Sequence, residues 1–227
     1  MLQSINKKKI IFFYLLILIF ITSINNRSLY EKIILNNEIT FEVNGLSNKD
    51  DLILRSNLKS FKKQNIFLIN KKELSELIIK NNIVLNFLVK KIYPNKIVIQ
   101  INKATKVGKI LKDNKTSIIV SNGKLIDYDN QQNLYLPYFY GDFNQKEFLK
   151  LFVMLKRVKL DFQKIESFYF FPSRRWDIKF KDGLLIRLPE NNPTKSLSFV
   201  LNLLDEKKFI NSKVLDLRSN NKIISDG

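Results

Sequence analysis

Two stretches of the chain match S-x-x-K, the spacing at which a serine nucleophile can work beside a lysine. They are Ser56 with Lys59 and Ser60 with Lys63. Membrane-anchored penicillin-binding enzymes combine such a pair with a K-T-G sequence, which this chain lacks. Because lysine is abundant here, both matches are interpreted as chance, and they predict no acyl-transfer chemistry.

Other catalytic and metal chemistry is limited by what the composition omits. The chain has no His and no Cys, which excludes a Ser-His-Asp triad, a His-ligated metal and a thiolate nucleophile within it. Asp127 and Asp129 resemble the start of a calcium loop, but Gln132 and Tyr138 stand where Gly and Glu are needed. The glycines are too far apart for a phosphate-binding loop. We therefore expect no metal and no cofactor.

The net charge of +18 allows two interpretations. One is an electrostatic surface for nucleic acid or anionic lipid, and the other is a Lys-rich composition whose charges cover solvated faces. Only seven of the 39 basic residues are Arg, and the lysines form no long block. Because Arg is the side chain suited to bidentate phosphate binding, we favour the second interpretation.

An apolar segment follows three lysines near the N-terminus. Residues 10–24 read IIFFYLLILIFITSI and carry no charge. Fifteen helical residues reach about 22 Å, short of a roughly 30 Å hydrocarbon core, so the predicted transmembrane helix extends to Arg27, whose side chain can reach the interface. The side chains expected to anchor it are Ile10, Phe12, Phe13, Leu15, Leu16, Leu18 and Phe20.

A cleaved signal peptide would have a similar basic and apolar pattern. Its cleavage site would need small residues of the A-x-A type, and the segment ends in TSINN without any Ala. We therefore favour an uncleaved anchor. The balance of basic residues on its two sides predicts residues 1–9 in the cytoplasm and the rest of the chain across the membrane.

The remainder of the chain predicts a mixture of helices and strands. Its first part has the order β-α-α-β-β, with strands at 39–46, 83–92 and 96–101 and helices that begin after Ser47 and Asn70. The second part has a capping box at Asn144 and Glu147, a hairpin at 174–189 with a type I′ turn at Asp182-Gly183, and a helix that begins near Pro193. Trp176 alternates with Ile178 and Phe180, which places it in the core rather than at an interface.

Four passages of the sequence are weak indicators of a protein family when taken singly, but their order along the chain is more specific. They are NIFLINKKELSELI with LVKKIYPNKIVIQINKATKVGKI (65–110), GKLIDYDNQQNLYLPYFYG (123–141), RRWDIKFKDGLLIRLP (174–189) and LDLR (215–218). Together they resemble the FtsQ/DivIB family of bacterial cell-division proteins. Lys91, Tyr93-Pro94 and Leu136-Pro137 fit the family pattern, whereas residues 102–105, NKAT, depart from its acidic-basic-Pro sequence.

The resemblance implies an α+β fold in four parts. They are a cytoplasmic tail (1–9), a single N-terminal transmembrane helix (10–27), a POTRA-like β-α-α-β-β domain (36–103) and an FtsQ-type, β-rich domain with two or so helices (105–227). It also implies a protein of the bacterial inner membrane at the division septum, with the bulk of the chain in the periplasm. Its implied role is that of a non-enzymatic scaffold that links inner-membrane division proteins.

The partners implied by the resemblance are FtsB-like and FtsL-like coiled-coil division proteins and the septal peptidoglycan synthase complex, with no nucleic acid and no small-molecule substrate. The expected contact is β-strand augmentation at an open sheet edge. Asp216 and Arg218, two residues apart in a strand, should share one face and fix the penultimate strand. The residues expected to bind partners are Arg174, Arg175, Arg218, Ser219, Asn220, Asn221, Lys222, Ile223 and Ile224.

Two other classes of protein compete with this interpretation. A POTRA-bearing envelope transport or assembly factor would need a long membrane β-barrel after the module, for which we see no room. A secreted basic protein could instead bind nucleic acid or lipid through its lysines, and its binding would then be released at high salt.

Overall fold

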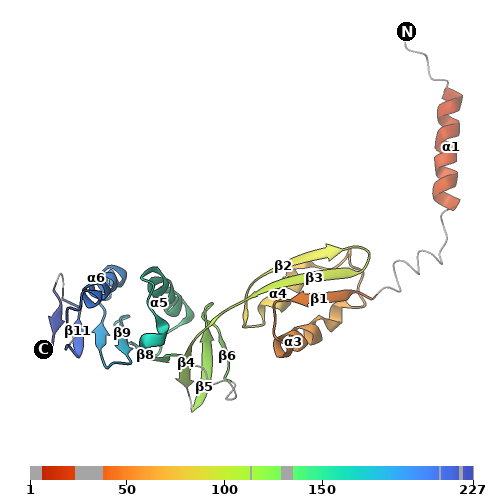
Figure 1. The fold of residues 1–227 in the computed structure, drawn as a ribbon. Helices are drawn as coiled ribbons and strands as arrows, with labels where there is room; N and C mark the ends of the chain where they lie inside the picture. Colours follow the sequence, from red (N-terminus) through yellow and green to blue (C-terminus); the bar gives the residue numbers. More distant parts are fainter. Residues whose placement is uncertain are drawn as a thin grey trace, which may run out of the picture. The chain divides into compact units, whose positions relative to one another are not determined.

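A computed structural model describes residues 7–23, 38–112, 114–128, 135–209, 211–219 and 222–226 (Figure 1). The chain divides into two compact units, and each is described by itself. The first contains Met1–Lys80 and Phe87–Ile101, and the second contains Asn81–Asn86 and Asn102–Gly227. The fold is a mixture of helices and strands, which confirms the α+β class.

Helix α1 (Lys7–Ser23) contains the predicted anchor residues, and their side chains are exposed. Within the described residues, no helix is both long enough and apolar enough to cross a membrane. The transmembrane helix predicted over 10–27 is therefore not confirmed, and its residues 24–27 lie outside the described residues.

The first unit has the β-α-α-β-β order that the sequence predicts. Its elements are β1 (Thr40–Asn44), α3 (Asn48–Leu58), the short 3₁₀ helix η2 (Lys59–Phe61), α4 (Lys71–Ile79), β2 (Val84–Ile92) and β3 (Lys96–Lys103). The sheet order is β1-β3-β2, so β1 and β2 are the edge strands. Strands β1 and β3 are parallel.

Apolar alternation builds the core of the first unit. Phe41 and Val43 on β1 pair with Ile97 and Ile99 on β3, and all four side chains are buried. The helices supply the opposing layer with Leu54, Leu58, Leu74 and Ile78, each at most 1% exposed. This is the packing that a period of two in the strands and an i, i+4 spacing in the helices predict.

The second unit is a nine-stranded sheet with two longer helices. Its elements are β4 (Lys106–Lys112), β5 (Lys115–Val120), β6 (Leu125–Asp127), β7 (Tyr138–Tyr140), α5 (Gln145–Arg157), the 3₁₀ helix η3 (Phe162–Lys164), β8 (Ile165–Phe170), β9 (Trp176–Phe180), β10 (Leu185–Arg187), α6 (Pro193–Asp205), β11 (Val214–Asp216) and β12 (Ile224–Ser225). The order β12-β11-β10-β9-β8-β7-β4-β5-β6 leaves β12 and β6 at the two edges.

Helices α5 and α6 lie on the same side of this sheet (Figure 1). The core beneath them contains one inward-facing residue from each central strand: Phe139, Phe168, Ile178, Ile186 and Leu215, all at most 1% exposed. Trp176 is 7% exposed and its ring lies 5.0 Å from that of Phe143, which confirms its predicted place in the core. The opposite face of the sheet has no helix from the described residues packed on it.

The predicted helix starts have mixed outcomes. Asn70 and Asn144 cap their helices, and Asn144 forms the complete capping box with Glu147. Ser47 is the N-cap of α3, but its hydroxyl donates to the Asp50 carboxylate instead of capping the backbone. In a capping box a Glu or Gln stands at the position of Asp50. Here the shorter Asp50 side chain binds the Ser47 hydroxyl instead.

The turn between β9 and β10 differs from the prediction. A type I′ turn requires a positive φ at both central residues, and of the pair Asp182-Gly183 only Gly183 has one, at 97°. Phe180 N–H donates to the Leu184 carbonyl, so the hairpin loop is one residue longer than predicted. Asp182 accepts from Leu184 N–H, a local bond that stabilises this longer loop.

Candidate functional site: the C-terminal edge of the sheet

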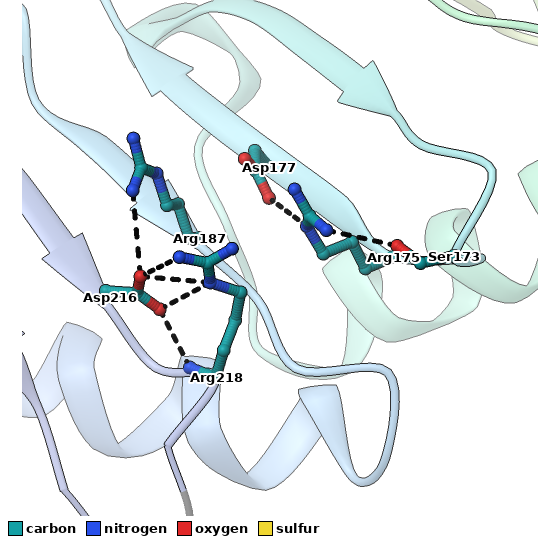
Figure 2. A network of polar contacts seen from close by, with 6 residues as sticks. All are labelled: Ser173, Arg175, Asp177, Arg187, Asp216 and Arg218. Atoms are coloured by element: carbon teal, nitrogen blue, oxygen red, sulfur yellow. Dashed lines mark hydrogen bonds and ion pairs between the residues drawn. The ribbon is translucent and has the colours of Figure 1, made fainter.

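The C-terminal end of the nine-stranded sheet has a row of charged residues on its helix-free face. Arg187 on β10 lies opposite Asp177 on β9 and opposite Asp216 on β11, and Asp216 in turn lies opposite Ile224 on β12. Because alternate residues of a strand face opposite sides, the row lies behind the buried core residues of the same strands. Figure 2 shows the resulting network of polar contacts.

Asp216 and Arg218 form a tight pair within this row. Arg218 Nε donates to both carboxylate oxygens of Asp216, at 2.8 and 2.9 Å, and Arg218 Nη2 donates to Asp216 Oδ2. The backbone N–H of Arg218 adds a bond of 3.0 Å, and Arg187 Nη1 lies 3.7 Å away. The hydrogen bonds from the Arg218 side chain lower the pKa of Asp216 to about 2. The predicted sharing of a face by Asp216 and Arg218 is thus confirmed.

Asp177 behaves in the opposite way, although arginines surround it as well. Its side chain is 5% exposed, and Arg175 Nε lies 3.5 Å from its Oδ1, with neither atom making a hydrogen bond within the described chain. Burial raises the pKa of Asp177 and outweighs the opposing fields of Arg175, Arg187 and Arg218. The row therefore holds one strongly ionised carboxylate at the edge and one poorly solvated carboxylate two strands further in.

Arg174 and Arg175 occupy the tight loop before β9. Arg175 is held by Ser173 Oγ at 3.1 Å, and its guanidinium lies 4.2 Å from the centre of the Phe171 ring. Arg174 has a left-handed backbone, with φ at 58°, and its side chain is exposed. Of the two predicted arginines, Arg175 joins the network in Figure 2, and Arg174 is not one of its six residues.

Strand β12 forms the outer edge beside this network. Asp226 N–H donates to the Val214 carbonyl, and Asp226 Oδ1 accepts from Val214 N–H at 2.5 Å. In an antiparallel pair, the backbone N–H and C=O groups of successive residues point alternately toward and away from the neighbouring strand. The backbone groups of Ile224 and Asp226 therefore point toward β11. The N–H and C=O of Ser225 then point away from the sheet, where the strand order has no further neighbour among the described residues.

The structure places the other predicted binding residues around this strand. Ile223 is half-buried and packs against the core, and Ile224 is 55% exposed. Lys222 is exposed, and its N–H donates to the Ser219 carbonyl in a turn. Asn220 and Asn221 lie outside the described residues. The strand itself is Ile224–Ser225, which begins two residues later and ends one residue later than the predicted run of Lys222 to Ile224.

Sequence reasoning missed three residues of this site. Asp177 and Arg187 belong to strands whose cross-strand register cannot be read from their own patterns. The signal for Asp177 was available, since it follows Arg175 by two residues at the start of a predicted strand, the same spacing as that of Asp216 and Arg218. Ser225 was missed because the predicted strand ended one residue early.

Comparison with known proteins places these features in a family. Residues 110–218 match the model of the C-terminal domain of the cell division protein FtsQ/DivIB. Curated relatives named "Cell division protein FtsQ" align over up to 79% of this chain.

The domain formed by residues 110–218 belongs to the FtsQ/DivIB family. The FtsQ of Rickettsia typhi is 25% identical over 182 residues, which are 79% of this chain and 68% of that protein. The FtsQ of Bradyrhizobium diazoefficiens is 26% identical over 142 residues, and this covers 60% of this chain but only 41% of the relative. The extracytoplasmic domain of DivIB from Geobacillus stearothermophilus is a solved structure with a TM-score of 0.32 and 12% identity, covering 46% of this chain and 97% of that one.

The FtsQ/DivIB match supports a role in cell division. The matched domain begins in β4 and ends at Arg218, so it contains the paired Asp216 and Arg218 and the buried Asp177. Strand β12 lies just beyond the matched residues. The family match therefore does not extend to that strand.

Proposed function

We propose that this protein is a non-enzymatic scaffold of the division machinery that binds FtsB-like and FtsL-like coiled-coil proteins by β-strand augmentation at β12. The observation that carries the proposal is the position of Ser225, whose backbone N–H and C=O point away from β11 at the edge of the sheet. Unpaired backbone groups at such an edge are a template for another strand.

The charged row supports the same role. The pair of Asp216 with Arg218 fixes β11, the strand on which β12 rests. Arg218 is 41% exposed even while it is paired. An incoming segment with an acidic side chain would find this cation beside the edge, which favours one orientation of the partner.

The remaining parts fit a protein attached to the membrane. We propose that residues 36–103 act as a POTRA-like domain, that residues 105–227 form the FtsQ-type domain, and that α1 attaches the chain to the inner membrane with its N-terminus in the cytoplasm. Apolar side chains such as Phe12, Leu16 and Phe20 are more than half exposed on α1, and an apolar helix without a polar face needs lipid or protein around it. The bulk of the chain is then periplasmic, with contacts that extend to the septal peptidoglycan synthase complex.

The test compares two single substitutions in the full-length chain. Ser225→Pro removes the outward N–H, and the fixed ring is tolerated where an edge strand faces solvent. We expect affinity for the extracytoplasmic segment of an FtsB-like partner to fall about tenfold or more, since one backbone hydrogen bond is lost and the ring blocks the approaching strand. Isothermal titration calorimetry measures this change.

The matched control is Ser225→Ala, which alters the side chain and keeps the N–H. It should bind like the natural protein, and both variants should keep the circular dichroism spectrum of the folded chain. Equal affinity of the Pro and Ala variants would show that the partner does not pair with this edge.

A further inference from the structure

The first unit carries an exposed apolar cluster that the proposed partner site does not use. Phe67 and Leu68 are 64% and 80% exposed, and Tyr93 is 55% exposed. The rings of Phe67 and Tyr93 stack with their centroids 4.6 Å apart and an interplanar angle of 16°. We call these three residues the Phe67 cluster. Large apolar side chains that gather on a surface mark a place for a partner or for lipid.

The loop that presents the cluster is held firmly. Ile66 and Ile69 on either side of Phe67 and Leu68 are 3% and 4% exposed, so the loop is anchored in the core at both ends. Lys91 Nζ donates to the carbonyls of Ile66 and Ile69, at 2.7 and 3.2 Å. The loop therefore turns Phe67 and Leu68 outward as a fixed feature of the fold, and both remain in water without a covering element from the described chain.

A further turn fixes the direction of Phe67. The Asn65 side chain accepts a hydrogen bond from Phe67 N–H at 2.9 Å, and the Asn65 carbonyl accepts from Leu68 N–H at 2.9 Å. This Asx-type turn limits the backbone freedom that an apolar loop would otherwise have in water. Burial of the cluster against a partner would consequently cost little ordering entropy.

The two chain segments that carry the cluster are rich in lysine. Segments 61–73 and 88–96 contain seven lysines and a single acidic residue, Glu73. Lys71 is near enough to Lys91 to help lower its pKa, although burial of Lys91 is the larger cause. Lys62, Lys63 and Lys90 are exposed on the same two segments. Two of the lysines are neutralised by ion pairs, Lys72 with Glu76 and Lys96 with Glu42.

The cluster also lies at the end of the sheet where β1 begins. Thr40 N–H donates to the Asn95 carbonyl, and the Asn95 side chain donates to the Glu38 carbonyl. Tyr93 precedes Asn95 by two residues, so the β2–β3 turn and the start of β1 share one end of this unit (Figure 1). The inference rests on the proposed attachment through α1, which precedes β1 in the chain.

We propose that the Phe67 cluster and its lysines are a second, peripheral lipid-binding site that docks the first unit on an anionic bilayer surface. Tyr and Phe settle at the headgroup level of a bilayer, and apolar side chains with basic neighbours bind anionic lipid by burial and charge together. The site would hold the unit against the membrane surface independently of the β12 edge.

The test places a fluorescent reporter in the cluster of the full-length chain. Phe67→Trp is compared with the natural protein, whose only Trp, Trp176, is buried and gives the background. Each protein is mixed with vesicles of phosphatidylglycerol and phosphatidylcholine that have brominated acyl chains. We expect these lipids to quench the emission of the new Trp, and pure phosphatidylcholine vesicles to quench it much less. Phe199→Trp on α6 is the matched control, because Phe199 is exposed to a similar degree at 57%, and its emission should not change.

A second substitution tests the charge. Adding Lys71→Gln to the reporter should shift the ratio of quenched to unquenched emission about fivefold, which corresponds to one lysine near an anionic surface. Flotation of the same vesicles reports attachment through α1 separately. Flotation without quenching at position 67 would overturn the lipid site while leaving the attachment intact, and would assign the cluster to a protein partner. Absence of both would overturn the lipid site as well, whereas quenching without stable flotation would support it and count against the anchor.

Discussion

The two edges of the nine-stranded sheet differ in how their outward backbone groups are used. At β6 the carbonyl of Leu125 accepts a hydrogen bond of 2.7 Å from the Asn82 side chain. At β12 the Ser225 groups point outward, and the strand order has no neighbour for them in the described chain. Proteins blunt their sheet edges to avoid unwanted pairing. The outward carbonyl of Leu125 at the β6 edge is thus bonded within the chain, whereas β12 has no neighbouring strand on its outer side among the described residues. This difference fits the proposal that β12 pairs with a partner.

The neighbourhoods of the two edges differ in the same sense. Near β6, the ion pair of Lys115 with Asp127 is exposed on both sides and contributes little. Near β12, the Asp216 carboxylate is 13% exposed and is held by Arg218 and Arg187. Strand β11 is held firmly, and β12 beside it has a free outer side among the described residues. This arrangement favours the addition of a strand, because little order has to be created on binding.

The largest expected effect concerns the carboxylate that fixes β11. A pKa of about 2 for Asp216, against 3.8 for an ordinary Asp, corresponds to about 2 kcal/mol of folding free energy at neutral pH. Because the pKa is lowered in the folded state, this stability is present above pH 4 and is lost as the pH falls toward 2. Asp216→Asn should therefore cost up to about 2 kcal/mol at pH 7, measured by urea unfolding.

The pH profile supplies the control for this prediction. The Asp216→Asn variant should not show the loss of unfolding free energy that the natural protein shows between pH 4 and 2. Asp177→Asn should change the profile in the opposite direction, because burial raises the pKa of Asp177. A carboxyl group with a raised pKa lowers the stability of the folded protein as the pH rises above the usual pKa of Asp. The Asp177→Asn variant should not show this loss. Identical profiles for the two variants would contradict the contrast between the edge and the interior of the row.

A smaller effect is expected at the closed edge. Asn82→Ala frees the Leu125 carbonyl and should cost about 0.5 to 1 kcal/mol of unfolding free energy, since the lost hydrogen bond is partly replaced by water. Its affinity for the FtsB-like partner should stay within about twofold of the natural chain, a difference of less than 0.5 kcal/mol. Urea unfolding and calorimetry on one preparation measure both. A large loss of affinity would mean that the partner contacts both edges, and the comparison would fail.

Much of the fold was predictable because it depends on local patterns. The β-α-α-β-β order follows from alternation in residues 96–101 and from the Asn70 cap, and α5 follows from the capping box at Asn144. The strands that form the site are only two or three residues long, so their own sequences carry little periodicity. Their register is set by packing between distant segments, which brings Arg187 between Asp177 and Asp216.

The candidate site was predictable in its location but not in its chemistry. Asp216 and Arg218 were placed on one face from their spacing alone, and the structure confirms this. The burial of Asp177 depends on the strands around it, and the outward direction of Ser225 depends on which residue begins the pairing with β11. A shift of one residue reverses the direction of every backbone group in an edge strand, so the sequence alone could not identify the residue that faces a partner.

The most direct measurement of the central proposal is amide hydrogen exchange at Ser225, with and without the extracytoplasmic segment of an FtsB-like partner. Strand addition at β12 predicts fast exchange of the Ser225 amide in the free protein and slowing of about tenfold or more in the complex, because its N–H then donates to the added strand. The Asp226 amide, which already donates to Val214, should change much less. Saturated binding with unchanged exchange at Ser225 would contradict the proposal.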